Sequence, residues 1–200
     1  MKLAPYAEQA ARWPANGRHI LAQFDDDTII VYQAYRPEIA RWAIEHQRFG
    51  GPFSFGRMSW IKPNFLWMMF RCGWATKEGQ EHVLAVRVTR SLFDRILIRA
   101  VPSSYVPELY ADRAAWQADV DKSDVRLQWD PDHDPAGRKL ERRAIQLGVR
   151  GPMLAEFASP VAIEDITPLV REQHGNPALL TPIEDVYTVS DPEIRLRIGV

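Results

Sequence analysis

Hydrophobic residues in the first part of the chain follow a strand-like and then a helix-like pattern. The run Thr28–Tyr32 is apolar and β-branched and follows three consecutive aspartates, which predicts a strand buried on both faces. Pro37 suits the first turn of a helix, and apolar residues recur at helical spacing from Ile39 to Ile44 before two glycines interrupt them. We therefore expect a strand followed closely by a helix.

A second helix is expected after Pro63, where the run Phe65–Phe70 consists only of apolar residues. A helix that is apolar on every side has to be enclosed by protein, so this pattern predicts a helix at the centre of the core. Trp60, Trp67 and Trp74 recur at a constant spacing and would share one stripe of a longer helix. Such a stripe is more typical of a core than of a platform for stacking bases.

Strand and helix patterns continue to alternate through the middle of the chain. The run His82–Val88 has the composition of a strand, and Ser91 with Asp94 three residues later predicts the N-cap of a helix. Alternation over Val125–Trp129 predicts a half-buried strand. That strand should end at the turn-rich segment Asp130–Pro135.

The remaining segments have weaker patterns. We expect a helix over Glu108–Asp119, a short helix near Met153–Phe157 and a strand near Val161–Glu164, whereas Gly137–Gly151 fits either a helix or a strand. No repeat, low-complexity tract or linker divides the chain. The sequence therefore predicts one α+β domain over residues 1–200, with a mixed or split β-sheet and packed helices.

Composition narrows the functional classes. The 200 residues are 46% hydrophobic and 26% charged, which is typical of a globular chain that folds alone. Lys and Arg (25) nearly balance Asp and Glu (26), so no overall field attracts nucleic acid or a membrane surface. No segment approaches the ~20 apolar residues of a membrane span, and the expected location is the cytoplasm.

Metal sites and common nucleotide motifs have no support in the sequence. Cys72 is the only cysteine, and the five histidines lie far apart, so no metal is expected. The phosphate loop G-x-x-x-x-G-K-[ST], the dinucleotide fingerprint G-x-G-x-x-G and the motifs H-E-x-x-H and G-x-S-x-G are all absent. A binding site would have to be built from scattered side chains.

Polar residues stand in apolar surroundings between Tyr32 and Trp74. A buried polar group without a hydrogen bond costs about 1 to 3 kcal/mol, so each of these residues needs a partner. They could cap helices or extend a charged end to solvent, or they could line a ligand cleft. The residues are Gln33, Tyr35, Arg57, Ser59, Lys62, Asn64 and Arg71.

Two cations mark a candidate anion site within this region. Arg57 and Lys62 flank Ser59 and Trp60 just before the start of the apolar helix. Positive charge combined with free amide donors at a helix N-terminus suits a phosphate. We therefore expect an anionic ligand at this position.

A second cluster contains acidic residues at the end of the strand over Val125–Trp129. Gln128 and Asp130 precede His133, which has an aspartate on either side. Acidic side chains at a strand end can act as general bases or bind ribose hydroxyls, although such a loop is more often a solvated turn. His133 fits either a surface histidine or a catalytic acid.

Four blocks of the chain resemble the uncharacterised family described as domain of unknown function 4291. They are Asp26–Tyr35, Arg57–Trp74, Leu127–Pro131 and Arg142–Gly151, and the second block is highly specific. The resemblance spans nearly the whole chain. It implies kinship but no activity, because the family has no established function.

The opening of the chain also resembles ADP-ribosyltransferase-type domains. In those domains a His or Arg ends the first strand and contacts NAD, a Ser or Tyr strand precedes a helix, and a Gln/Glu-x-Glu motif lies on a later strand. Here Gln33, Ser59 and the pair Gln128-x-Asp130 stand at those positions. The chain thus departs from the pattern by Gln for His or Arg and by Asp for Glu.

This second resemblance implies an NAD-dependent transferase that passes ADP-ribose to an unknown acceptor, a protein or a nucleic acid. Gln33, Ser59 and Asp130 would form the catalytic site, with Asp130 stabilising the ribosyl cation that develops as nicotinamide leaves. The residues that would contact NAD are Tyr35, Arg57, Trp60, Lys62 and Gln128.

Two other classes remain open. A non-catalytic module could hold a nucleotide or an RNA end in the same cleft, with tryptophans for stacking and the two cations for phosphate. A structural or interaction domain would use the aromatic helix only as core, and an exposed Trp13 or Trp116 would mark the partner surface.

Overall fold

The computed structural model describes residues 1–200. In it, the strand β4 (Thr28–Tyr35) lies between two clusters of buried hydrophobic side chains. It pairs along its whole length with β6 (His82–Thr89), and β10 (Ala162–Asp165) pairs with the other edge of β6. All these pairings are antiparallel. Alternate residues of β4 belong to different clusters, so the prediction of a strand buried on both faces is confirmed.

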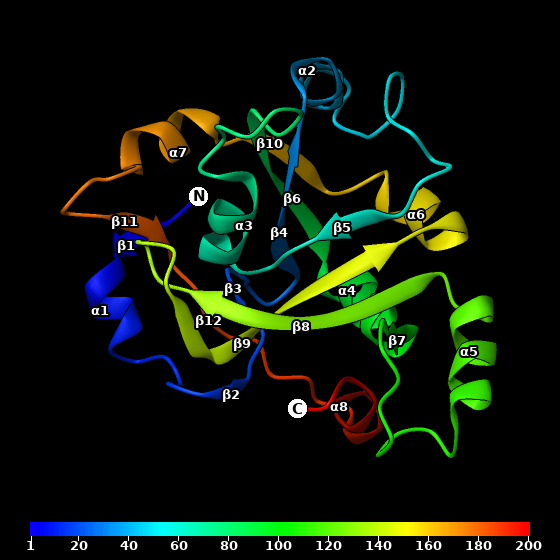
Figure 1. The fold of residues 1–200 in the computed structure, drawn as a ribbon. Helices are drawn as coiled ribbons and strands as arrows, with labels where there is room; N and C mark the ends of the chain where they lie inside the picture. Colours follow the sequence, from blue (N-terminus) through cyan, green and yellow to red (C-terminus); the bar gives the residue numbers. More distant parts are fainter.

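A second sheet is built around the two longest strands (Figure 1). β8 (Val125–His133) and β9 (Lys139–Val149) pair antiparallel, and β7 (Ala100–Pro102) adds to β8 in parallel. β9 also pairs with β2 (Gly17–Arg18) and with β5 (Ser59–Ile61). This sheet has five strands and mixed direction.

A single backbone bridge connects the two sheets. The amide of Tyr32 donates to the carbonyl of Lys62 at 2.7 Å, and the amide of Lys62 donates back at 3.2 Å. No ladder continues from this pair, so β4 and β5 separate beyond it. The expected α+β architecture with a split sheet is therefore present.

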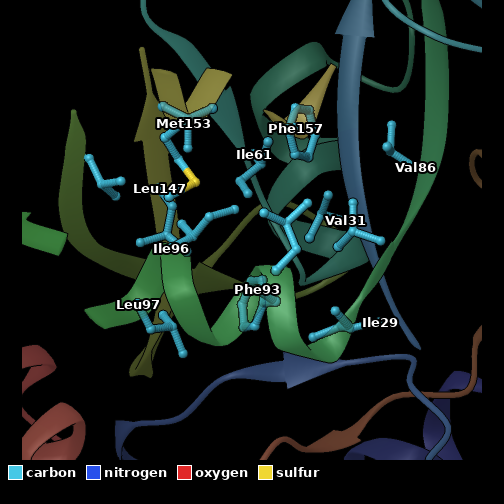
Figure 2. Packing of buried hydrophobic residues seen from close by; sticks show 14 of the residues in the cluster. Ile29, Val31, Ile61, Val86, Phe93, Ile96, Leu97, Leu147, Met153 and Phe157 are labelled. Carbon is cyan, nitrogen blue, oxygen red and sulfur yellow. The ribbon is translucent and has the colours of Figure 1, made fainter. Parts of the chain in front are cut away.

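The helices pack around both sheets. Figure 2 shows Phe93 and Ile96 of one helix and Met153 and Phe157 of another gathered against strand residues of the main core. None of the helices combines the length and the apolar character that a membrane crossing requires. The helices are α1 (Tyr6–Ala10), α2 (Pro37–His46), α3 (Phe65–Cys72), α4 (Arg90–Ile98), α5 (Arg113–Lys122), α6 (Gly151–Phe157), α7 (Thr167–Gln173) and α8 (Pro192–Ile198).

The two ends of the chain pair with each other. β1 (Leu3–Pro5) pairs antiparallel with β11 (Leu180–Pro182), and β3 (Leu21–Ala22) pairs antiparallel with β12 (Asp185–Val186). The N-terminal segment is therefore fixed only when the C-terminal segment is in place.

The helix α3 confirms one prediction and corrects two. Asn64 caps it by accepting the amide hydrogen of Trp67 at 2.7 Å, and all but two of its residues are buried. Phe70 is 39% exposed, however, so the expectation that protein encloses the helix on every side is wrong at that residue. The tryptophans share no stripe, because Trp60 lies in β5 and Trp74 follows the C-cap with a φ of 54°.

Two expected boundaries also differ from the structure. Thr89, not Ser91, caps α4, because its hydroxyl accepts the amide hydrogen of Leu92 at 3.2 Å. The segment Asp130–Pro135 is not simply a turn, since β8 continues through His133. The strand tolerates its proline because the pairing register shifts at this point.

Three further expectations need adjustment. The predicted helix over Glu108–Asp119 begins later, at Arg113, after Asp112 as its N-cap. The ambiguous stretch Gly137–Gly151 is mostly the strand β9. Trp13 is buried and donates from Nε1 to the carbonyl of Glu184 at 2.8 Å, so it marks no partner surface.

We predict that α3 contributes to stability mainly through its buried face. Leu66→Ala should lower the free energy of unfolding by about 2 to 5 kcal/mol, because it removes a buried side chain and leaves a cavity. Phe70→Ala should cost less despite the larger side chain, since Phe70 keeps much of its surface in water. Urea unfolding measures both values, and an equal or larger loss for Phe70→Ala would contradict this assignment.

Candidate functional site

A cleft of about 680 Å³ opens where β4 and β5 separate. Residues of both strands, of the segment before β5 and of β8 and β9 line it. Seven of the eight side chains expected in the site lie there. They are Gln33, Tyr35, Arg57, Ser59, Trp60, Lys62 and Gln128.

The floor of the cleft holds a chain of three polar side chains. Gln33 donates from Nε2 to the Ser59 hydroxyl at 2.7 Å and, more weakly, to the Trp60 carbonyl at 3.4 Å. The hydroxyls of Tyr35 and Ser59 lie 2.8 Å apart and share a hydrogen bond. The structure therefore brings Gln33 and Ser59 into direct contact. This is possible because β4 and β5 are still close together just beyond the backbone bridge that joins them.

Two hydrogen-bonding groups of these three side chains are left without partners. The Trp60 carbonyl can only accept, which fixes the amide of Gln33 and leaves its Oε1 unpaired, although Gln33 is only 2% exposed. Burial raises the pKa of Tyr35, so its hydroxyl keeps its proton. Tyr35 and Ser59 carry two hydroxyl hydrogens, and the bond between them uses only one. The other hydrogen has no acceptor. The floor thus offers one acceptor and one donor to a ligand.

Lys62 is a buried cation without a counterion. Its side chain lines the cleft, is 4% exposed, and makes no hydrogen bond or ion pair with the rest of the chain. Burial, and to a smaller extent the nearby Arg71, lowers the pKa of Lys62 to about 8, although Asp130 partly opposes both effects. The expectation that such side chains extend to solvent fits Arg57 and Arg71, which are exposed, whereas Lys62 is largely buried and reaches only the cleft.

The cleft carries positive charge without compensating acids. Its cations are Arg36, Arg57, Lys62 and Arg71, and no Asp or Glu lines it. Of these four, only Arg36 forms an ion pair within the chain, with the exposed Glu38 at 3.6 Å. Since the whole chain has a formal net charge of −1, this local excess favours an anionic ligand.

The start of α3 does not supply the free amide donors expected there. The amide of Phe65 donates to Oε1 of Glu184 at 2.6 Å, and the amide of Trp67 donates to Asn64. Burial raises the pKa of Glu184 well above its usual range. An internal carboxyl group thus takes one of the amides that were expected to be free at the helix N-terminus.

Asp130 lies next to the cleft rather than among its lining residues. Gln128 donates to its Oδ1 at 3.1 Å and Gln146 donates to its Oδ2 at 2.6 Å. Gln128 and Gln146 are direct partners across β8 and β9, so all three side chains share one face of the sheet. Both glutamines line the cleft, and they fix the orientation of the carboxylate behind them.

Gln146 is a site residue that the sequence pattern did not reveal. It is the lone polar side chain in the apolar run Ala144–Leu147, which is the signal that could have found it. The ambiguity of that stretch hid the register that places it opposite Gln128.

Trp60 and Met58 form one wall because Gly148 leaves room for them. Trp60 pairs with Gly148 across β5 and β9. A Cβ atom at position 148 would lie 2.5 Å from Sδ of Met58 and 3.1 Å from Cε2 of Trp60. The glycine therefore lets both side chains lie close against β9.

His133 is not the surface histidine that was one of the two roles considered for it. It is only 2% exposed, and its ring stacks on Phe70 at a centroid distance of 3.5 Å, with Trp67 nearby at 5.3 Å. Neither ring nitrogen has a partner, and burial lowers the pKa of His133. It is a packed core residue outside the cleft.

Comparison with known proteins places the chain in a family. A family model described as "Domain of unknown function (DUF4291)" matches residues 19–184. The chain belongs to this family. No curated protein matches the chain.

The family description assigns no activity, and the match does not bear on ADP-ribosyltransferases. Each of the four blocks that resemble the DUF4291 family contributes at least one residue to the cleft. The contributions include Gln33, Lys62, Gln128 and Gln146. Segments far apart in the sequence thus meet at one site.

We predict that Lys62→Met stabilises the unliganded protein while abolishing anion binding. A pKa lowered from 10.5 to about 8 corresponds to a burial cost of roughly 3 kcal/mol, so the variant should unfold at a higher urea concentration at pH 7. Pyrophosphate should raise the melting temperature of the wild type but not of the variant. The exposed Lys139→Met is the control and should change neither property.

The sign of the pH dependence follows from the lowered pKa. Between pH 8 and about 10.5 the unfolded chain binds a proton at Lys62 that the folded chain does not, so wild-type stability rises with pH there. Lys62→Met lacks this rise, so the difference in free energy of unfolding between the variant and the wild type should shrink across that range. Pyrophosphate binding to the wild type should weaken as the pH passes 8, and a flat binding profile would contradict the assignment.

Proposed function

We propose that the cleft binds NAD, breaks its nicotinamide–ribose bond and transfers ADP-ribose to an acceptor. The observation that carries this proposal is the convergence of residues from three separate strands. Gln33 and Ser59 touch at the floor, and Gln128 lines the same cleft while holding Asp130. These are the three positions at which the chain resembles ADP-ribosyltransferase-type domains.

The positive charge of the cleft supports the binding of a dinucleotide, because a dinucleotide contains a pyrophosphate. Lys62 is a desolvated cation without a partner, and Arg57 and Arg71 make no ion pair within the chain. A pyrophosphate supplies the negative charge that these side chains lack. It would also compensate the cost of keeping Lys62 buried.

The floor supports a group that both donates and accepts hydrogen bonds. Oε1 of Gln33 lacks a donor, and the Tyr35 and Ser59 pair has one hydrogen to give. The nicotinamide carboxamide or a ribose hydroxyl has both capacities. We assign this end of NAD to the floor, with Trp60 available for stacking.

The reaction then needs only electrostatic stabilisation and positioning. The bond between C1′ and the nicotinamide nitrogen breaks, its electron pair leaves with nicotinamide, and positive charge develops on the ribose. The carboxylate of Asp130 stabilises that charge and takes the proton of the attacking acceptor. The amides of Gln128 and Gln146 hold both carboxylate oxygens in place before the reaction.

A binding module without chemistry is the second candidate, and one observation favours it. Asp130 is not among the residues that line the cleft, and both its oxygens already accept hydrogen bonds. A nucleotide held by the cations alone would need no contact with this carboxylate.

Asp130→Asn separates the two candidates. In a transferase it should lower the rate of nicotinamide release by about a hundredfold or more, equivalent to roughly 2.7 kcal/mol of transition-state stabilisation. Binding of NAD, measured by calorimetry, should change little. The substitution keeps the shape of the side chain, and either glutamine amide can turn over to accept from the new amide group.

Asp134→Asn is the matched control, because this carboxylate follows the same strand but lies outside the cleft. Its rate of nicotinamide release should equal that of the wild type. If the wild type binds NAD but releases no nicotinamide with any acceptor, the binding module is correct. If it binds no NAD at all, the proposal is wrong.

A further inference from the structure

The rim of the cleft is formed largely by the segment between α2 and β5. Figure 1 shows this segment as a long excursion that stands clear of the sheets. Most of its residues beyond the glycine pair are exposed. Those that line the cleft are Pro52, Phe53, Ser54, Arg57 and Met58.

Phe55 presents an aromatic ring to solvent at this rim. It is 46% exposed, although its neighbour Phe53 is buried and lines the cleft. The two rings meet edge to face at a centroid distance of 5.1 Å, so Phe55 stands on the outer side of the cleft wall. A large exposed ring beside a ligand site is typical of a contact surface.

Two arginines lie at the mouth of the same cleft. Arg36 and Arg57 both line the cleft and both are exposed, so they lie at its mouth rather than at its floor. The lining contains no carboxylate, and deeper in the cleft Lys62 remains for the phosphates of a dinucleotide. Positive charge at the mouth repels a lysine or arginine side chain as acceptor and attracts an anionic one.

We propose that the acceptor is single-stranded nucleic acid, held at the rim by Phe55 and Arg36; this rests on the proposed transfer of ADP-ribose. An aromatic ring beside cations is the combination that binds single strands, with a base stacked on the ring and phosphates near the arginines. A duplex hides its base faces in its own stack, so an unpaired nucleotide fits better. Acidic peptides share the charge but not the stacking face.

The chemical step is a transfer to a nucleophilic atom of one nucleotide. A base nitrogen or a hydroxyl oxygen forms a bond to C1′ of the ribose as the bond from C1′ to nicotinamide breaks. The electron pair of that bond leaves with nicotinamide, and the proton of the attacking group passes to the carboxylate of Asp130. No oxidant, reductant or metal is required.

Binding is tested without NAD, by fluorescence anisotropy of short labelled DNA and RNA strands. Phe55→Leu should weaken binding by about 5- to 150-fold, because loss of one stacked base costs about 1 to 3 kcal/mol. Phe70→Leu is the matched control: Phe70 is an exposed phenylalanine outside the cleft, and its replacement should leave the affinity unchanged.

The arginine contact has a separate signature in salt. Arg36→Gln should make the dependence of log affinity on log salt concentration less steep by about 0.7, the value for one phosphate contact on a single strand. Arg171→Gln, on the exposed face of α7, should leave the slope unchanged.

Transfer is tested with NAD and the same strands. The wild type should add one ADP-ribosyl group to a single strand, detected as a mass gain, and should modify the matching duplex much less. Equal modification of the duplex, or preferential binding and modification of acidic peptides, would overturn the proposal.

The outcomes also separate this proposal from the one on which it rests. If nicotinamide is released but no strand binds or gains mass, the nucleic-acid acceptor is wrong and NAD cleavage stands. If strands bind through Phe55 but no nicotinamide is released, both proposals fall. Mass gain that is lost in Phe55→Leu and retained in Phe70→Leu supports both.

Discussion

The pair of backbone hydrogen bonds between Tyr32 and Lys62 is the constraint on which the site depends. It joins the two sheets at one point, and beyond it the edges of β4 and β5 face each other without a ladder. Unpaired strand edges need partners, and here the side chain of Gln33 supplies one by donating to the Trp60 carbonyl. The gap between β4 and β5 thus forms the polar floor of the cleft. The backbone hydrogen bonds of Lys62 hold that residue beside it.

Local periodicity predicted most of the fold, because β4, α2, α3 and β6 each have an uninterrupted pattern. It failed where tertiary pairing outweighed local preference. The proline in Asp130–Pro135 suggests a turn, yet a register shift keeps this segment in β8. A seven-residue spacing of tryptophans suggests a stripe, yet the N-cap at Asn64 and the left-handed C-cap at Gly73 end the helix between them. Caps and register depend on contacts that a linear pattern does not contain.

The candidate site was partly readable from the sequence for a chemical reason. Polar residues between apolar neighbours have to find partners, and this rule located Gln33, Ser59 and Lys62. It could not show that Ser59 is the partner of Gln33, or that Lys62 has none. It also missed Gln146, whose position opposite Gln128 follows from strand pairing. The amides at the start of α3 were expected to be free, but Glu184, far along the chain, takes one of them.

That contact between Glu184 and α3 has a consequence for synthesis on the ribosome. The side chain accepts from the amide of Phe65 and from Nδ2 of Asn64, while its backbone bonds to Gln9 and Trp13. Chains emerge from the N-terminus, so α3 and the first strands leave the ribosome long before residue 184 does. The start of α3 therefore cannot make its contact with this carboxyl group during synthesis until residue 184 has left the ribosome, long after the helix itself has emerged.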